Sequence, residues 1–346
     1  MSKEYPTRGE INKPDVKFYD PEQAPFRIHG VWKEGGVFRR MPDEAAKKVS
    51  EPVYGNSRCS AGGRIRFITD SPYVIIRTKV ATTRDCHGTL TGGAGYDLYT
   101  TYEGETRYGG TFMFPADFVD KYESIVNLTP RKQLITINMP LFAETSEVSI
   151  GLAEGCLLEE APDYSRMTPI VYYGSSITHG GCASRSGMAY ANIVARRFDS
   201  DYISLGFNGS ARGEVEMAEY IASLKMSVFV MDYDHNSPTE ELAIHHGRRF
   251  DIIRAAQPNL PILMMSRPVY YLNEDDTARR DIVKGTYERA KAAGDENVWF
   301  LSGPELMALC KEEGSVDGCH PTDLGFFSMA AAVGKVMEEI FAKIEG

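Results

Sequence analysis

Residues 169–178 read PIVYYGSSIT, a short apolar run that ends in a glycine and two serines. Similar apolar runs follow at 228–231 (VFVM), 261–265 (PILMM) and 297–301 (NVWFL). Short continuous apolar runs are typical of strands buried on both faces, as in a parallel sheet. Because helical patterns lie between the runs, residues 166–346 are predicted to form a three-layer α/β/α domain.

Two helices of this domain have clear sequence signals. Residues 237–241 (SPTEE) supply a capping serine, a first-turn proline and acids at the positive end of a helix. From about Thr322, apolar residues recur at helical spacing and predict a long final helix. These residues are Phe326, Ala330, Val333, Met337 and Ile340.

Residues 1–165 have a different pattern, with short β-rich runs bounded by turn residues. The runs are RIRFIT (64–69), VIIRTKV (74–80), LITINM (134–139) and VSIGL (148–152). Such spacing predicts an N-terminal β-sandwich or jelly roll. We expect one short helix near Pro42 and a linker at 159–166.

The chain has 346 residues, with 38 Lys and Arg against 48 Asp and Glu, and a net charge of −10. Nucleic acids and anionic membrane surfaces bind through basic patches, so neither is the expected partner. No window is long and apolar enough for a membrane span. The first residues, MSKEYPTR, lack the apolar stretch of a secretory signal, so we expect a cytoplasmic protein.

Six cysteines are scattered without a C-x-x-C pair, and we expect reduced thiols and no disulfide. They are Cys59, Cys86, Cys156, Cys182, Cys310 and Cys319. The histidines show no metal-binding spacing, so neither a metal nor another cofactor is expected.

Gly174 comes directly after the first apolar run of the α/β domain, and Ser176 lies two residues further along the chain. The carboxyl ends of parallel strands are where such sheets bind ligands. A serine there offers a hydroxyl nucleophile and backbone N–H groups for an oxyanion. An ordinary loop is the alternative interpretation, because Gly-Ser-Ser is common in loops.

Asp317 and His320 are three residues apart, just before the final helix. A carboxylate in that position can orient the imidazole, whose other nitrogen is then able to take a proton from a serine. A capped helix start with an exposed histidine is the alternative interpretation.

Gly209 and Asn236 follow two further apolar segments, at 202–203 and 228–231. Their backbone N–H and side-chain amide, with the N–H of Ser176, could form an oxyanion hole. The alternatives are a tight turn at Gly209 and a helix cap at Asn236.

These four blocks, in this order, resemble the SGNH (GDSL-type) hydrolases. Residues 95–99 (GYDLY) resemble the Gly-x-Asp-Leu-Tyr signature of the β domain that precedes one branch of these esterases. The resemblance implies Ser176 as nucleophile, His320 as base and Asp317 as orienting acid. It also implies an oxyanion hole of Ser176, Gly209 and Asn236.

Two positions depart from the family pattern. Ser175 stands where the family has an aspartate before the nucleophile, and Asn236 lies in D-x-x-x-N rather than Gly-x-Asn-Asp. The resemblance implies a serine esterase that removes small acyl groups, acetyl above all, from a carbohydrate. The expected partner is a small-molecule ester or an oligosaccharide ester substrate, and the sequence leaves a homo-oligomer open. The alternatives are a lipase or thioesterase acting on a non-sugar ester, and a non-catalytic glycan-binding protein.

Other noticeable residues have structural interpretations. The adjacent pair His245 and His246 is expected to be solvated or packed, and Cys319 is expected to be a packing thiol rather than a nucleophile. Asp97 and Tyr99 of the signature could brace the β domain rather than touch substrate.

Overall fold

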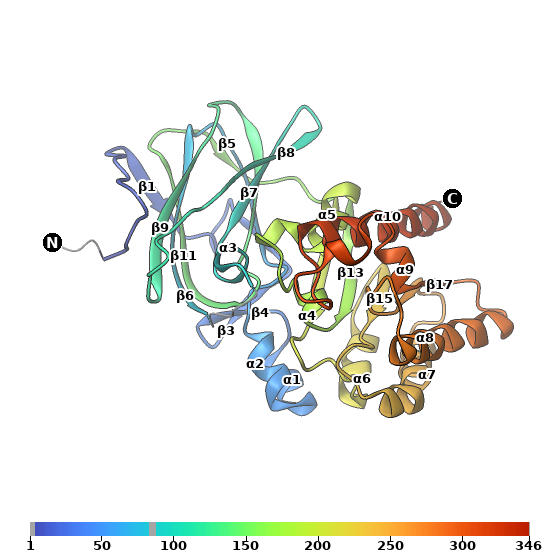
Figure 1. The fold of residues 1–346 in the computed structure, drawn as a ribbon. Helices are drawn as coiled ribbons and strands as arrows, with labels where there is room; N and C mark the ends of the chain where they lie inside the picture. The colour runs from blue at the N-terminus through green and yellow to red at the C-terminus, as the bar shows by residue number, and fades with distance from the viewer. Residues whose placement is uncertain (1–3, 83–87, 346) are drawn as a thin grey trace. The chain divides into compact units, whose positions relative to one another are not determined.

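The computed structural model describes residues 4–82 and 88–345 (Figure 1). The chain forms two compact units. The first unit contains residues 1–40, 58–163 and 184–187, and the second contains 41–57, 164–183 and 188–346. Six chain segments therefore alternate between the two units.

The first unit contains two antiparallel sheets. One has the order β1-β11-β6-β9, and the other has the order β12-β5-β10-β7-β8 with β2 paired to β5. The strands of the first sheet are β1 (Val16–Tyr19), β11 (Ala143–Ala153), β6 (Tyr73–Thr82) and β9 (Lys121–Asn127). Those of the second are β12 (Leu158–Glu159), β5 (Arg64–Thr69), β10 (Gln133–Asn138), β7 (Asp97–Tyr102), β8 (Glu105–Thr111) and β2 (Arg27–His29). A hairpin of β3 (Trp32–Glu34) and β4 (Val37–Arg39) and a short helix α3 (Leu90–Gly93) complete the unit.

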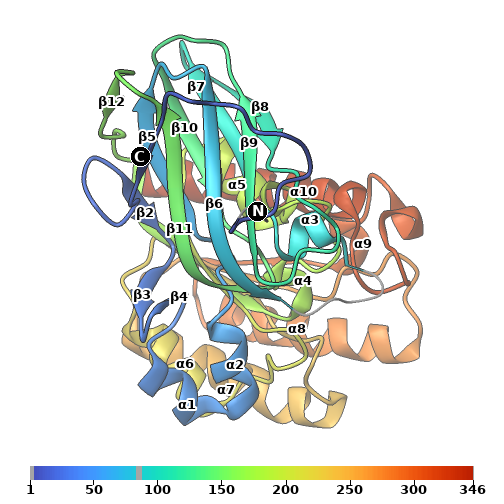
Figure 2. The ribbon, with the colours of Figure 1, turned by 90° about the vertical axis from the view of Figure 1, so that its left-hand side faces the viewer.

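Both sheets bury one face in a shared core. Figure 2 shows the two layers one behind the other. Phe67 and Ile135 come from one sheet, and Ile76 and Ile150 come from the other. Each strand turns alternate residues inward because side chains alternate across a strand. The predicted β-sandwich is confirmed.

The second unit contains a five-stranded parallel sheet in the order β14-β13-β15-β16-β17. Its strands are β13 (Arg166–Gly174), β14 (Ser200–Gly206), β15 (Val228–Asp232), β16 (Ile262–Met265) and β17 (Val298–Leu301). Its helices are α1 (Asp43–Val49), α2 (Glu51–Ser57), α4 (Ser176–His179), α5 (Tyr190–Phe198), α6 (Val215–Ser223), α7 (Thr239–Ala256), α8 (Glu274–Ala292), α9 (Gly303–Leu306) and α10 (Asp323–Glu345).

Helices cover both faces of this sheet (Figure 1). On one face, Phe229 and Met231 of β15 pack in a core with residues of α6, α7 and α8. On the other face, the ring of Tyr172 lies 5.5 Å from that of Tyr190 in α5, and Tyr190 stacks on Phe326 of α10. The predicted three-layer α/β/α architecture is confirmed.

The division of the chain differs from the single boundary at residue 165 that the sequence predicts. The helices α1 and α2 belong to the second unit, where Ala46 and Val53 join the core beside α6. Residues 184–187, in turn, belong to the first unit. Short amphipathic helices bury their apolar face wherever a partner is available, so sequence position does not assign them to a unit.

Two smaller features also differ from expectation. Pro238, not Ser237, occupies the N-cap position of α7 and makes no side-chain cap, and the Ser237 hydroxyl is buried without a hydrogen-bond partner. Residues 91–95 (TGGAG), a glycine-rich string typical of a turn, instead begin within the short helix α3 (Leu90–Gly93). None of the five described cysteines forms a disulfide, and Cys86 lies outside the described residues.

Candidate active site

Ser176 is the first residue of α4, a single helical turn just beyond the carboxyl end of β13. The Oγ of Ser175 caps this turn by accepting a hydrogen bond from the N–H of Ile177 at 3.2 Å. The turn ends at Gly180, whose φ of 106° lies in the left-handed region that favours glycine. Ser175 therefore shapes the turn, and Ser176 is the serine presented at its start.

Two glycines let α4 pack directly against the strand ends. A Cβ on Gly174 would lie 2.0 Å from Oγ1 of Thr178, and a Cβ on Gly206 would lie 2.2 Å from the backbone N of His179. Neither distance is compatible with a side chain. The glycine before the two serines is therefore required for the packing of the turn that carries Ser176.

The structure brings Ser176, His320 and Asp317 together, although Ser176 and His320 are 144 residues apart in sequence. The Oγ of Ser176 lies 2.9 Å from Nε2 of His320, and Nδ1 of His320 lies 2.8 Å from Oδ2 of Asp317. With the Nδ1–H donating to the carboxylate, Nε2 has a lone pair for the serine hydroxyl. A serine hydrolase triad requires hydrogen bonds of this kind.

The Asp317 carboxylate is held by its own loop. Its Oδ1 accepts hydrogen bonds from the N–H groups of Cys319 at 2.9 Å and His320 at 2.7 Å. Burial acts to raise the pKa of Asp317, but the bonds from His320 and Cys319 outweigh it and lower the pKa to about 2. Asp317 is therefore ionised at neutral pH and can stabilise an imidazolium at His320.

The strand register places the other two blocks on either side of Ser176. Gly174 pairs with Gly206 of β14 and with Asp232 of β15, so the three strands end at the same level. Gly209 follows the end of β14, and Asn236 follows the end of β15. Both lie just past this common edge of the sheet.

A hydrogen bond joins the Gly209 and Asn236 blocks. The N–H of Ala211 donates to Oδ1 of Asn236 at 3.3 Å, which orients the amide and leaves its NH₂ to donate elsewhere. Gly209 has a φ of 67°, and its N–H makes no hydrogen bond to another described residue. Both groups can therefore donate to a ligand oxygen.

The buried carboxylate of Asp232, which was not among the predicted site residues, holds the turn that carries Ser176 through a hydrogen bond to Thr178. Asp232, at the end of β15, accepts hydrogen bonds from Oγ1 of Thr178 at 2.7 Å and from the hydroxyl of Tyr190 at 2.9 Å. Burial raises the pKa of Asp232 to about 7, while the two hydrogen bonds act in the opposite direction. The signal available in the sequence was an acid at the end of a buried strand.

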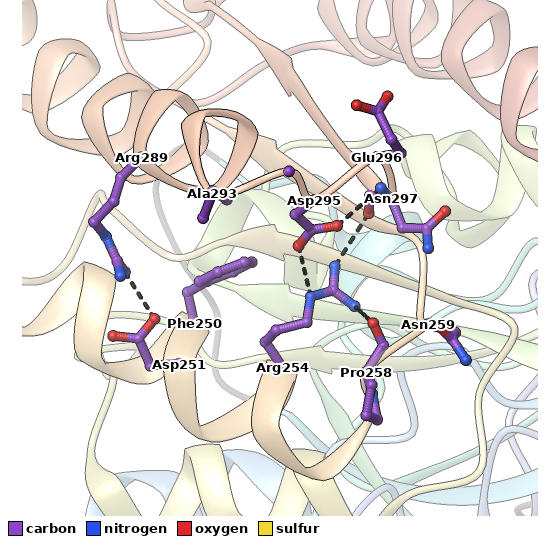
Figure 3. A pocket seen from close by; sticks show the side chains of 12 residues that line it. Phe250, Asp251, Arg254, Pro258, Asn259, Arg289, Ala293, Asp295, Glu296 and Asn297 are labelled. Atoms are coloured by element: carbon purple, nitrogen blue, oxygen red, sulfur yellow. Dashed lines mark hydrogen bonds and ion pairs between the residues drawn. The ribbon is translucent and has the colours of Figure 1, made fainter.

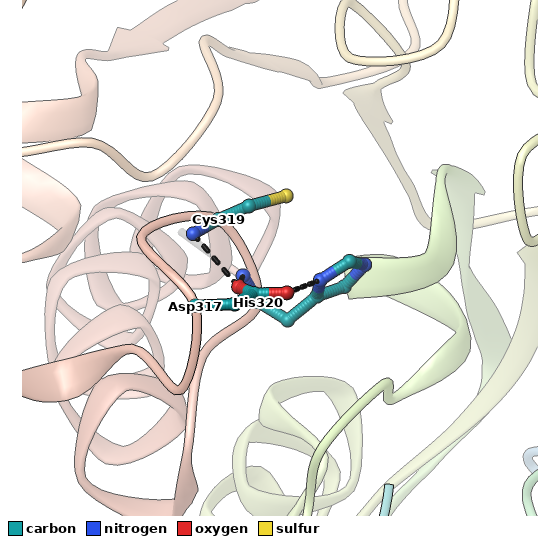
Figure 4. Close-up of side chains that lie close together, drawn as sticks. All are labelled: Asp317, Cys319 and His320. Carbon is teal, nitrogen blue, oxygen red and sulfur yellow. Dashed lines mark hydrogen bonds and ion pairs between the residues drawn. The ribbon is translucent and has the colours of Figure 1, made fainter. Parts of the chain in front are cut away.

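Asp317, Cys319 and His320 place three types of metal ligand within 4.8 Å of one another. Figure 4 shows the Asp317 oxygens already engaged by the Cys319 N–H and the His320 ring. The Cys319 Sγ lies 3.0 Å from Nε2 of His235, and burial raises the pKa of the thiol to about 11. A protonated thiol bonded to a histidine fits a packing role better than a nucleophile or a metal ligand.

Of the adjacent histidines of α7, His246 is packed in the interior. His246 is buried, its ring stacks on that of Tyr233 at 5.4 Å, and its Nδ1 lies 2.8 Å from Oγ1 of Thr286. Burial lowers the pKa of His246 to about 3, so the ring is neutral. His245 is only partly buried.

A surface hollow of about 490 Å³ lies beside α7 and α8 (Figure 3). Its charged groups are already paired. Arg254 lies 2.8 Å from Asp295 and donates to carbonyl oxygens within residues 257–260, while Arg289 lies 2.8 Å from Asp251. None of the residues predicted for the ester site lines this hollow.

Two protein families match consecutive parts of the chain. Residues 16–158 match the N-terminus of SGNH-hydrolase-type esterases, the Gly-x-Asp-Leu-Tyr domain, and residues 167–338 match the GDSL-like lipase/acylhydrolase family. The chain belongs to the GDSL-like lipase/acylhydrolase family. This acylhydrolase is a carboxylic ester hydrolase, as the resemblance implied. No match was found among curated protein sequences.

Solved structures share the fold across most of the acylhydrolase. A protein described as a GDSL-like lipase from Bacteroides ovatus superposes with a TM-score of 0.85 at 24% identity, covering 94% of this chain and 98% of that one. A salicylyl-acyltransferase from a tetracycline biosynthetic pathway gives 0.75 at 20% identity, covering 95% and 98%. An acetyl xylan esterase from Butyrivibrio proteoclasticus gives 0.59 at 12% identity, covering 94% and 99%.

The described part of the acylhydrolase contains no helix with the length and apolar character needed to cross a membrane.

Proposed function

We propose that this acylhydrolase is a serine esterase that removes small acyl groups, acetyl above all, from a carbohydrate. The observation that carries the proposal is the relay from Ser176 through His320 to Asp317, with separations of 2.9 and 2.8 Å. A hydroxyl bonded to an imidazole that is oriented by an ionised carboxylate is an activated nucleophile.

In the proposed mechanism, the Oγ of Ser176 attacks the ester carbonyl as Nε2 of His320 takes the hydroxyl proton. The carbonyl oxygen becomes an oxyanion, stabilised by the N–H groups of Ser176 and Gly209 and by the amide of Asn236. His320 then gives its proton to the departing alcohol, leaving an acyl-enzyme. Water attacks the acyl-enzyme with His320 as base, and the acid leaves as Ser176 regains its proton.

The choice of a sugar ester rests on the β-sandwich and on the solved structures that share the fold. A β-sandwich joined to an esterase suits an extended glycan, and one protein with this fold is an acetyl xylan esterase. The salicylyl-acyltransferase supports a second outcome, in which the acyl group passes to an alcohol instead of water. Both outcomes begin with the same acyl-enzyme on Ser176.

The test is a screen of acetylated oligosaccharides in which released acetate is measured by an enzyme-coupled assay. Ser176→Ala serves as the inactive control. We expect acetate release by the wild type and faster hydrolysis of p-nitrophenyl acetate than of long-chain p-nitrophenyl esters. Faster hydrolysis of the long-chain esters would favour a lipase. Transfer of the acetyl group to an added alcohol, in place of acetate release, would favour a transferase. Sugar binding without any acyl release would favour a glycan-binding protein.

A further inference from the structure

The loop that carries Asn236 is bonded by an arginine from another helix of the second unit. This loop, residues 234–237, lies between β15 and α7. Nη1 of Arg279, in α8, donates to the carbonyl oxygen of Asp234 at 2.5 Å and to that of Ser237 at 2.8 Å. One guanidinium nitrogen therefore bonds both the first and the last residue of the loop.

Arg279 lies on the buried face of α8. The buried residues of this helix recur at helical spacing and are Asp276, Arg279, Val283, Thr286 and Ala290. Only 9% of the Arg279 side chain is exposed. An arginine is rarely buried to this extent unless hydrogen bonds and an opposite charge replace the water that it loses. The two loop carbonyls supply part of that replacement, so the guanidinium and the loop hold each other in place.

A carboxylate on the same helix orients the guanidinium. Nε of Arg279 donates to Oδ2 of Asp275 at 2.9 Å. Oδ1 of Asp275 accepts a hydrogen bond from Oγ1 of Thr239, the first residue of α7, at 2.5 Å. Hydrogen bonds between charged partners are stronger than those between neutral groups. Arg279 therefore approaches the loop in a direction that Asp275 fixes.

The side chain of Asn236 has a weaker restraint of its own. The bond from the N–H of Ala211 to its Oδ1 is 3.3 Å long, beyond the usual range for an N–H···O bond. The bonds from Arg279 to the loop carbonyls are shorter and come from a charged donor. The direction of the Asn236 amide therefore depends mainly on where the backbone on either side of it is held.

We propose that Arg279 is a positioning residue for the ester chemistry and that it acts through Asn236. By holding the backbone on both sides of Asn236, it keeps the amide NH₂ directed at the position where the oxyanion forms. The inference rests on the proposed function, because Asn236 has an oxyanion to stabilise only in a working esterase. Loss of one such donor typically lowers kcat about 10²- to 10³-fold. The effect of Arg279 through this route cannot exceed the effect of removing the Asn236 amide itself.

The test is a double-mutant cycle between Arg279→Gln and Asn236→Ala. Arg279→Gln removes both the charge and the Nη1 donor. Arg280→Gln is the matched control, because it makes the same change one residue further along α8, where the guanidinium pairs with Asp281. Each substitution is made in the wild type and in Asn236→Ala, and kcat and KM for p-nitrophenyl acetate are measured well below the unfolding temperature of each protein.

In the wild-type background, Arg279→Gln should lower kcat about tenfold to a hundredfold with little change in KM, because the oxyanion exists only after the attack on the ester. In the Asn236→Ala background, the same substitution should lower kcat less than about threefold, because the donor that Arg279 positions is already absent. Arg280→Gln should change neither kcat nor KM in either background.

An equal loss of kcat in the two backgrounds would overturn the inference, because Arg279 would then act by a route other than Asn236. An unchanged kcat in Arg279→Gln, or an equal loss in Arg280→Gln, would overturn it as well. Should Arg279→Gln fail to fold, Arg279→Lys provides the same test, because lysine keeps the charge but lacks the planar guanidinium. A wild-type protein that neither hydrolyses the ester nor reacts with a fluorophosphonate would overturn the proposed function, and this inference with it.

Discussion

Asp232 should make the second unit progressively less stable as the pH rises from about 4 to about 7. Burial raises its pKa from 3.8 to about 7. Between these two pH values the folded unit therefore keeps the carboxyl proton, whereas the unfolded chain has released it. Stability from this proton is fully present below pH 3.8 and is lost as the pH rises through about 7. At 1.36 kcal/mol per pKa unit, the loss between pH 5 and pH 8 is about 3 kcal/mol.

The Asp232→Asn variant removes this titration because an amide stays neutral throughout. Urea unfolding at pH 5 and pH 8 is followed by the fluorescence of Trp299, which lies in β17 of the second unit. Trp32 belongs to the first unit and is replaced by phenylalanine in every protein compared. The free energy of unfolding of the Asp232 protein should fall by about 3 kcal/mol more than that of the variant over this interval.

The matched control is Asp251→Asn, which changes a surface carboxylate of α7 and should leave the pH dependence as it was. An identical fall in Asp232→Asn and in the parent would refute the reasoning, because it would mean that the folded unit does not hold the extra proton. A larger fall in the free energy of unfolding of Asp232→Asn than of the parent would contradict the predicted direction of the pH effect.

Three substitutions test the site itself. Asp317→Asn should lower kcat about 10³- to 10⁴-fold with little change in KM, because an amide orients the wrong imidazole tautomer; steady-state kinetics measure it, and a loss under tenfold would contradict the relay. Asn236→Ala should lower kcat about 10²-fold as one oxyanion donor is lost, and an effect confined to KM would speak against that role. Gly174→Ala should prevent the second unit from folding, since its Cβ would lie 2.3 Å from the backbone carbonyl oxygen of Asp232 in the neighbouring strand; native Trp299 fluorescence in that variant would disprove the packing argument.

The strands of the parallel sheet were predictable because each is a buried apolar run. The run at 169–173 lies within β13 (Arg166–Gly174), and the run at 228–231 lies within β15 (Val228–Asp232). The proximity of Ser176, His320 and Asp317 was also predictable, because parallel strands end at one edge and the family resemblance assigned the order of the blocks. The structure places His320 and Asp317 within hydrogen-bonding reach of this edge.

Buried polar contacts were not predictable in the same way. The bonds from Thr178 and Tyr190 to Asp232, and the contact between Cys319 and His235, depend on side-chain packing across distant segments. Periodicity reports which face of an element is apolar, but it does not report which polar groups meet inside.

The assignment of residues 41–57 to the second unit and of residues 184–187 to the first was not predicted, for a related reason. The helices at 43–57 carry an apolar face but no signal of which core it joins. Residues 184–187 are held by Asp97 and by the hydroxyl of Thr91, and neither contact has a local pattern. The GYDLY string indicated a β domain, but it did not indicate that its aspartate, Asp97, bonds a segment about 90 residues further along the chain.

The most direct test of the account is the covalent labelling of Ser176. A fluorophosphonate probe followed by peptide mass spectrometry should place the label on Ser176, with acetate release lost in proportion to labelling. Ser175→Ala is the matched control, because it removes the neighbouring hydroxyl and weakens a helix cap but should still label and turn over. The account predicts that Ser176→Ala neither labels nor hydrolyses p-nitrophenyl acetate while unfolding as the wild type does. Full hydrolysis by Ser176→Ala, or a label on Ser175, would contradict it.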